Sequence, residues 1–141
     1  MNADITARLA NLGTWQLSQA SARSHKVLHA RLARAGANGY EYRILAVLGD
    51  LGAVSQADLG RAAVLDRRDV THTVRNLQAR ALVTRRSDPG DRRQTLVELT
   101  AAGASTLERL DAVLAEVQTE VFAALSADQR RTLLNLLQQL S

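Results

Sequence analysis

Two adjacent arginines, Arg92 and Arg93, have the chemistry best suited to binding another molecule. They follow Asp88-Pro-Gly-Asp91, which has the residue order of a β-turn, with proline and then glycine at its centre. A guanidinium is planar, permanently charged and weakly hydrated, so it tolerates a narrow anionic groove. We therefore expect this turn to present its arginines to a phosphate-lined surface.

The positive charge of the chain is concentrated around this turn. The 141 residues together carry a formal charge of +4. Residues 61–93 contain nine arginines and four aspartates, so this segment carries +5 and the rest of the chain −1. Lys26 is the only lysine, and arginine favours forked contacts to phosphates and guanines. The segment indicates a polyanionic partner, and the alternative is an ordinary solvated surface.

Apolar spacing and capping residues predict the elements that position the arginine turn. The predicted helices cover residues 4–35, 40–48, 55–63, 67–80, 100–125 and 126 onward. Short strands are expected at 82–86 and 95–99, on either side of the turn. Ser55, Asp66 and Ser126 precede helices and have side chains that cap backbone N–H groups.

This order of elements predicts a mostly α (α+β) winged helix-turn-helix that binds double-stranded DNA. The helix over 67–80 would enter a major groove, and the hairpin over 82–99 would reach the adjacent minor groove. The expected DNA contacts are Arg67, Arg68, Thr71, His72, Arg75, Arg85, Arg86, Arg92 and Arg93. Asp91 is expected to orient the guanidinium of Arg93 through a salt bridge within the hairpin.

The same segments resemble the MarR family of bacterial transcriptional regulators. The most specific match is Asp88-Pro-Gly-Asp-Arg-Arg93, followed by Val97-Glu-Leu-Thr100 and Gly103. Supporting matches are Ser55-Gln-Ala-Asp-Leu-Gly60, Leu65-Asp-Arg67, Arg80-Ala-Leu-Val-Thr-Arg-Arg86 and Leu125-Ser-Ala-Asp-Gln129. The chain departs from the family at Arg68-Asp69 and His72, where relatives commonly carry Ser-Thr and arginine, so their base preference does not transfer.

The resemblance implies a single domain over 1–141 with a helical dimerisation region. The helices in 4–35 and 100–141 would form a homodimer, and two winged modules over 40–99 would read a palindromic operator. It also implies a repressor released by a small aromatic or anionic ligand. Apolar stripes on the first and last helices, more than one winged module can cover, independently favour a dimer.

Three residues are candidates for an effector pocket: Trp15, Tyr42 and Arg43. Trp15 could stack on a planar ligand, although a core or dimer position is the alternative. Arg43 would suit a carboxylate. His25 and His29 share a helix face, but zinc needs further ligands, so we expect no metal site.

Other function classes are excluded or set aside by what the sequence lacks. With no cysteine, disulfides and thiolate metal sites are excluded. No apolar run is long enough for a membrane span and no signal-peptide pattern opens the chain, so we expect a cytoplasmic protein. No catalytic motif is found, so neither an enzyme nor a cofactor is expected. Two alternatives to a ligand-released repressor stay open: a ligand-independent or architectural DNA binder, and a helical protein-interaction dimer.

Overall fold

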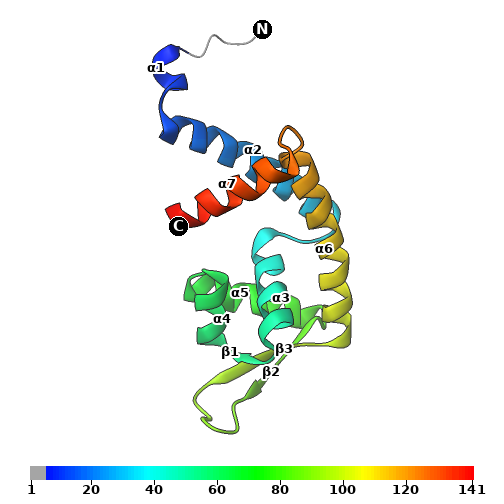
Figure 1. Ribbon diagram of the computed structural model, residues 1–141. Coiled ribbons are helices and arrows are strands. Elements are labelled where there is room, and N and C mark those ends of the chain that lie inside the picture. The colour runs from blue at the N-terminus through cyan, green and yellow to red at the C-terminus, as the bar shows by residue number, and fades with distance from the viewer. Residues whose placement is uncertain (1–5) are drawn as a thin grey trace. The chain divides into compact units, whose positions relative to one another are not determined.

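The computed structural model describes residues 6–141, which form seven helices and three short strands (Figure 1). The helices are α1 (Ala7–Ala10), α2 (Gly13–Arg34), α3 (Gly39–Leu51), α4 (Gln56–Ala63), α5 (Arg67–Ala79), α6 (Ala101–Val121) and α7 (Ala127–Leu140). The strands are β1 (Val54–Ser55), β2 (Val83–Ser87) and β3 (Thr95–Leu99). The predicted fold class, a mostly helical winged helix-turn-helix, is confirmed.

The chain divides into two compact units. Unit 1 comprises the residues up to Ala30 together with Leu114–Ser141, and unit 2 comprises Arg31–Val113. Unit 2 therefore holds α3, α4, α5 and the whole sheet. In the part of the chain that the structure describes, no helix is long and apolar enough to cross a membrane.

Unit 2 is built around a small antiparallel sheet in the order β1-β3-β2. The β2–β3 hairpin pairs Val83 with Leu99 at its base and Ser87 with Thr95 near its tip. Apolar side chains from α3, α4, α5, α6, β2 and β3 are fully buried and form the core of this unit: Ile44, Leu45, Leu59, Val70, Val74, Leu77, Val83, Val97 and Leu110. The core holds α5 beside the hairpin, and the hairpin projects beyond the helices (Figure 1).

Side-chain caps begin the helices where the sequence predicts them. The Ser55 hydroxyl accepts a hydrogen bond from the Asp58 N–H at 3.1 Å, at the start of α4. The Asp66 carboxylate accepts from the Asp69 N–H at 2.8 Å, at the start of α5. Ser126 and Gln129 form a reciprocal capping box at the start of α7. Because each cap is a local contact, it can be predicted from residue type and spacing alone.

The prediction of one helix over residues 4–35 is wrong, because the helix is interrupted between α1 and α2. Residues 4 and 5 lie outside the described part of the chain. Asn11 is the C-terminal cap of α1, and its backbone N–H donates to the Ala7 carbonyl at 3.1 Å. The α2 helix begins at Gly13. Asparagine and glycine both disfavour helix interiors, so two of them within three residues outweigh the apolar periodicity.

Three further boundaries differ from the prediction. The α3 helix continues through Gly49 to Leu51, beyond the predicted end at Leu48. A Cβ at Gly49 would lie 2.5 Å from Leu107 Cδ2, so glycine at this position allows that leucine to pack closely. The α6 helix ends at Val121, four residues before the predicted end. The two-residue strand β1 was not predicted, since it exists only through pairing with the distant β3.

The junction between the hairpin and α6 requires glycine at position 103. The Thr100 hydroxyl donates to the Ala81 carbonyl at 2.7 Å and accepts from the Gly103 N–H at 3.0 Å. A Cβ at Gly103 would lie only 2.0 Å from the Leu82 carbonyl oxygen. Glycine at this position therefore allows the start of α6 to pack directly on the backbone that leads into β2.

Candidate nucleic-acid interface

The α5 helix has two faces of opposite character. Val70, Thr73, Val74 and Leu77 are buried in the core of unit 2. The other face is open, and a shallow hollow along it is lined by Arg67, Arg68, Thr71, His72 and Arg75. The structure thus brings together on α5 all five residues that the sequence predicts as DNA contacts in the helix over 67–80.

Thr71 is a member of this open face whose hydroxyl is engaged with two other residues of the protein. Its Oγ1 donates to the Arg67 carbonyl at 2.9 Å and accepts from Nε2 of Gln56 at 3.0 Å. The hydroxyl proton is therefore used within the protein, and the methyl group is the part left for an outside partner. Gln56, the first residue of α4, was not singled out from the sequence because its partner lies on another helix.

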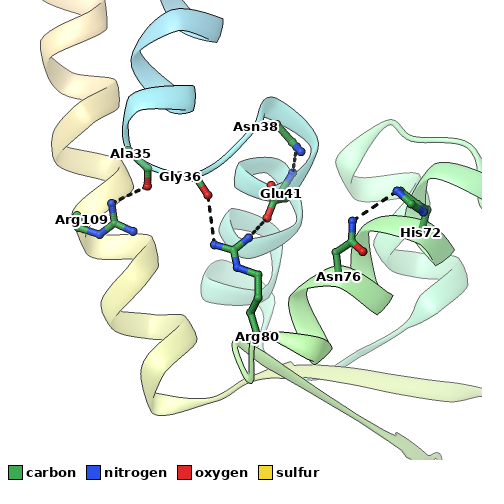
Figure 2. A network of polar contacts seen from close by, with 8 residues as sticks. All are labelled: Ala35, Gly36, Asn38, Glu41, His72, Asn76, Arg80 and Arg109. Atoms are coloured by element: carbon green, nitrogen blue, oxygen red, sulfur yellow. Dashed lines mark hydrogen bonds and ion pairs between the residues drawn. The ribbon is translucent and has the colours of Figure 1, made fainter.

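His72 and Asn76 form a second pair on the exposed side of α5 (Figure 2). The side-chain nitrogen Nδ2 of Asn76 lies 3.4 Å from Nε2 of His72. The two residues are one helical turn apart, so this contact follows from their i, i+4 spacing. It links the imidazole to an exposed neighbour rather than to the core.

The β2–β3 hairpin is the wing of the fold, and its tip consists of two consecutive turns. The Asp91 N–H donates to the Asp88 carbonyl at 3.2 Å, which closes the turn that the sequence predicts. The Asp88 carboxylate also accepts from the Gly90 N–H at 2.8 Å. A second turn follows, in which the Gln94 N–H donates to the Asp91 carbonyl at 2.9 Å. Arg92 and Arg93 occupy the centre of this second turn.

Asp91 contacts Arg93 through both its backbone and its side chain. The Asp91 Oδ1 atom accepts from the Arg93 backbone N–H at 3.1 Å and lies 3.4 Å from its Nε. The Arg93 side chain is 93% exposed, and an ion pair this exposed adds little to stability. Its consequence is geometric, because it restricts the directions in which the guanidinium points.

A larger hollow, about 610 Å³ in volume, lies between α4, the start of α5 and the wing. Four arginines line it: Arg61, Arg67, Arg85 and Arg93. Arg61 is also hydrogen-bonded to Asp58, and this contact, together with hydrogen bonding from the Ser55 hydroxyl, lowers the pKa of the Asp58 carboxyl. Arg61 was counted in the basic segment but not proposed as a contact, and its place in this hollow depends on tertiary packing.

Two other arginines of the basic segment are paired with glutamates. Arg86 lies on β2 with its Nε 3.3 Å from the Glu98 carboxylate on β3, so the predicted contact residue also braces the hairpin. Arg80 is bonded to Glu41 and to the Gly36 carbonyl (Figure 2). The simple count of nine arginines therefore overstates the charge that an outside partner can use.

The three candidate effector residues are distributed over both units. Trp15, in unit 1, is half-buried, and its buried Nε1 has no hydrogen-bond partner among the described residues. In unit 2, the Tyr42 hydroxyl donates to the Asp111 carboxylate at 2.7 Å, and burial together with this bond raises the pKa of Tyr42 to about 12. Arg43 donates to the Ala63 and Val64 carbonyls at 3.4 and 3.3 Å, at the end of α4. Their shared pocket stays a prediction.

His25 and His29, the two histidines on α2, have stacked rings with centroids 6.2 Å apart. Across residues 6–141 no group of three or more His, Cys, Asp or Glu side chains is arranged to hold a metal ion. Their i, i+4 spacing on α2 accounts for the ring contact.

The chain is similar to several known regulators. Residues 35–94 match the model of the MarR family. The chain is 30% identical to the HTH-type transcriptional repressor NicR of Pseudomonas putida over 137 residues, which cover 97% of this chain and 84% of that protein. Because this relative is matched over most of both lengths, the likeness includes unit 1 as well as the winged module.

Solved structures agree with the sequence comparison. A probable transcriptional regulator from Pseudomonas aeruginosa is 32% identical, with a TM-score of 0.85 over 94% of this chain and 99% of that chain. BpsR of Bordetella bronchiseptica, whose DNA binding is regulated by 6-hydroxynicotinic acid, is 26% identical. Its TM-score is 0.80, and the match covers 89% of this chain and 95% of that chain. With the wing signature and the arginine-lined face of α5, these likenesses show that the chain belongs to the MarR family of winged helix-turn-helix transcriptional regulators, which bind DNA and are not enzymes.

Proposed function

We propose that this protein is a homodimeric repressor that binds a palindromic operator and is released from it by a small aromatic anion. The observation that carries the proposal is the continuous arginine-lined surface of unit 2. It extends from the open face of α5, through the hollow beside α4, to the exposed guanidinium of Arg93 at the wing tip. Such a surface has the positive charge and the relief that complement a duplex groove.

In the proposed complex, α5 lies in a major groove and the wing reaches the neighbouring minor groove. The hollow between them receives the phosphate backbone that separates the two grooves, with Arg67 and Arg85 as its nearest cations. Arg93 enters the minor groove, held in direction by Asp91, and Arg92 contacts the backbone beside it. Arg86 adds charge at the hairpin while bonded to Glu98.

Base reading is assigned to the open face of α5. Arg68 and Arg75 carry forked donors that match the two acceptors of guanine. His72 lies between them on the same face. The Thr71 hydroxyl already donates its proton to the Arg67 carbonyl. Its methyl group is therefore assigned an apolar contact with the methyl group of thymine.

A second copy of the chain is the partner proposed for unit 1. Large apolar side chains of this unit are exposed: Leu12, Leu17, Leu125, Leu134, Leu136 and Leu140. Exposed leucines in such number usually mark an interaction surface. The proposed interface lies within residues 4–35 and 100–141, and it places one α5 helix of each subunit over successive major grooves.

The effector is proposed from the relatives and from two side chains. BpsR responds to 6-hydroxynicotinic acid, a small ring that bears a carboxylate. Trp15 has an unpartnered buried Nε1, and the contacts of Arg43 with two carbonyls, at 3.3 and 3.4 Å, are long enough to be exchanged for a carboxylate. A ligand releases DNA only if it binds the two conformations of the dimer with different affinity.

The experiment is selection of bound duplexes from a random library, followed by titration of the selected sequence. We expect an inverted repeat, and an affinity that falls steeply with salt because each dimer neutralises about six or more phosphates. We then expect 6-hydroxynicotinic acid, used as the probe, to weaken operator binding. Enrichment of no sequence would contradict the repressor, and an unaffected operator would favour a ligand-independent binder.

A further inference from the structure

One turn in unit 2 is contacted by arginine side chains from two other segments. The turn follows α2 and includes Ala35, Gly36 and Asn38 (Figure 2). Arg80, at the end of α5, donates to the Gly36 carbonyl at 3.3 Å. Arg109, on α6, donates to the Ala35 carbonyl at 2.9 Å. The carbonyls that end α2 are therefore bonded to guanidinium groups from two other helices.

Arg80 bridges this turn to the start of α3. One guanidinium nitrogen, Nη1, is paired with the Glu41 carboxylate, while Nη2 donates to Gly36. Glu41 is 7% exposed and is the only buried carboxylate among the described residues. Its backbone N–H is held by the Asn38 side chain at 2.9 Å. A buried carboxylate needs a charged partner, and Arg80 supplies it while 43% of its own side chain stays exposed.

The location of Arg80 on α5 makes this bridge relevant to DNA. Arg80 is the C-terminal cap of α5, one residue after Ala79, and the chain then turns through Ala81 at a φ of +58° into β2. Loss of the bridge would free the end of α5 that lies farthest from its Asp66 cap. The direction of α5 in a major groove depends on both of its ends.

We propose that Arg80 is a positioning residue for the reading helix, and that it joins the end of α5 to the turn after α2 without contacting DNA. The proposal rests on the proposed function, because it takes α5 as the helix that reads the operator. The carbonyl that Arg80 bonds, at Gly36, follows the end of α2 by two residues, so the bridge ties the end of α5 to the start of this turn within unit 2. Arg80 differs from the other paired arginines of the basic segment because its carboxylate partner is buried, whereas Asp58 and Glu98 are exposed or half-buried.

The test compares Arg80→Lys and Arg80→Gln with Arg85→Gln. Lysine keeps the charge beside Glu41 but replaces two separate nitrogens by one, so it cannot reproduce the fork. We expect Arg80→Lys to remain folded and to bind the selected operator at least tenfold more weakly, with nonspecific affinity within twofold of wild type. Arg80→Gln should lose more affinity, with an unchanged slope of log affinity against log salt.

Arg85→Gln is the matched control for a phosphate contact. It should lower the salt slope by about one per subunit and weaken specific and nonspecific binding alike. If Arg80→Gln lowers the slope in the same way, Arg80 contacts phosphate and the proposal is wrong. Operator binding by Arg80→Lys at wild-type strength would also overturn it.

Hydrogen exchange on the DNA-free protein separates this proposal from the proposed function. In Arg80→Lys we expect faster amide exchange in residues 76–82 and 35–41, with residues 67–71 unchanged. Unchanged exchange at both ends of the bridge would reject the positioning role. If the wild-type protein selects no operator while the exchange result holds, the proposed function fails and the link between the two segments stands.

Discussion

Leu77 on α5 and Leu136 on α7 are both leucines of amphipathic helices, yet Leu77 is fully buried and Leu136 is 53% exposed. The two units differ in the same way. Of the fourteen buried apolar residues in the described part of the chain, Val117 alone belongs to unit 1. Unit 2 has a core of its own, whereas unit 1 leaves most of its large apolar side chains partly or fully exposed. Stability and assembly should therefore respond to changes in different units.

The largest effect is expected from charges on the exposed face of α7. Replacing Leu136 and Leu140 by lysine places two charges one turn apart on a surface proposed to be buried in the dimer. Burial of each leucine contributes about 1.5–3 kcal/mol, so the dimer dissociation constant should rise by roughly a thousandfold or more. Light scattering gives the mass, and operator binding should fall with it.

Leu51→Lys is the control in unit 2, where Leu51 is 60% exposed. It should leave the mass unchanged. If the Leu136, Leu140 double variant keeps a dimer mass and full operator affinity, the exposed leucines of α7 do not form the dimer interface.

A smaller effect, confined to stability, is expected at the tightest contact of unit 2. Gly103→Ala places a methyl group 2.0 Å from the Leu82 carbonyl oxygen, so the backbone must shift. We expect the free energy of unfolding to fall by about 1–3 kcal/mol, as measured by urea denaturation. Gly13→Ala at the start of α2 meets nothing within 4 Å and should be neutral or stabilising. Equal losses in both variants would contradict the packing argument.

The wing should affect DNA binding without affecting either stability or assembly. Arg93→Ala removes an exposed guanidinium, and we expect operator affinity to fall by about 1–3 kcal/mol per half-site. The unfolding transition and the mass should not change, because the side chain is 93% exposed. Arg131→Ala, which removes an exposed arginine of unit 1, is the control and should bind operator normally. A monomeric Arg93 variant would mean that this arginine is structural.

The smallest effect is expected at the turn between α4 and α5. Val64 has a left-handed backbone, with a φ of 55°, and is 81% exposed. A β-branched residue is strained there, and glycine removes the strain while raising the entropy of the unfolded chain. Val64→Gly should therefore stabilise unit 2 by less than about 1 kcal/mol. A measurable loss of stability would show that the exposed side chain has a partner.

Features set by local contacts were predictable from the sequence. The caps at Ser55, Asp66 and Ser126 and the first turn of the wing depend on residues within four positions of one another. The alternation of buried and open residues on α5 follows from helical periodicity. These signals were sufficient for the winged helix-turn-helix and for the composition of its open face.

Features set by distant contacts could not be predicted. Arg80 looked like one more cation in the basic segment, because its partner Glu41 is 39 residues away in the sequence. The bond between Gln56 and Thr71 depends on how two helices pack. The break before Gly13 was missed for another reason: an apolar stripe predicted a helix more strongly than Asn11 and Gly13 argued against one.

The separation of α5 into two faces has a consequence for how such a regulator diversifies. Arg68, His72 and Arg75 face outward and take no part in the core, so their replacement leaves the folding energy almost untouched. If these residues read bases as proposed, new operator preferences are accessible by single substitutions, in evolution or by engineering, without compensating changes elsewhere. Thr71 is the exception on this face, because its exchange also breaks the bond to Gln56. A redesign should vary Thr71 and Gln56 together.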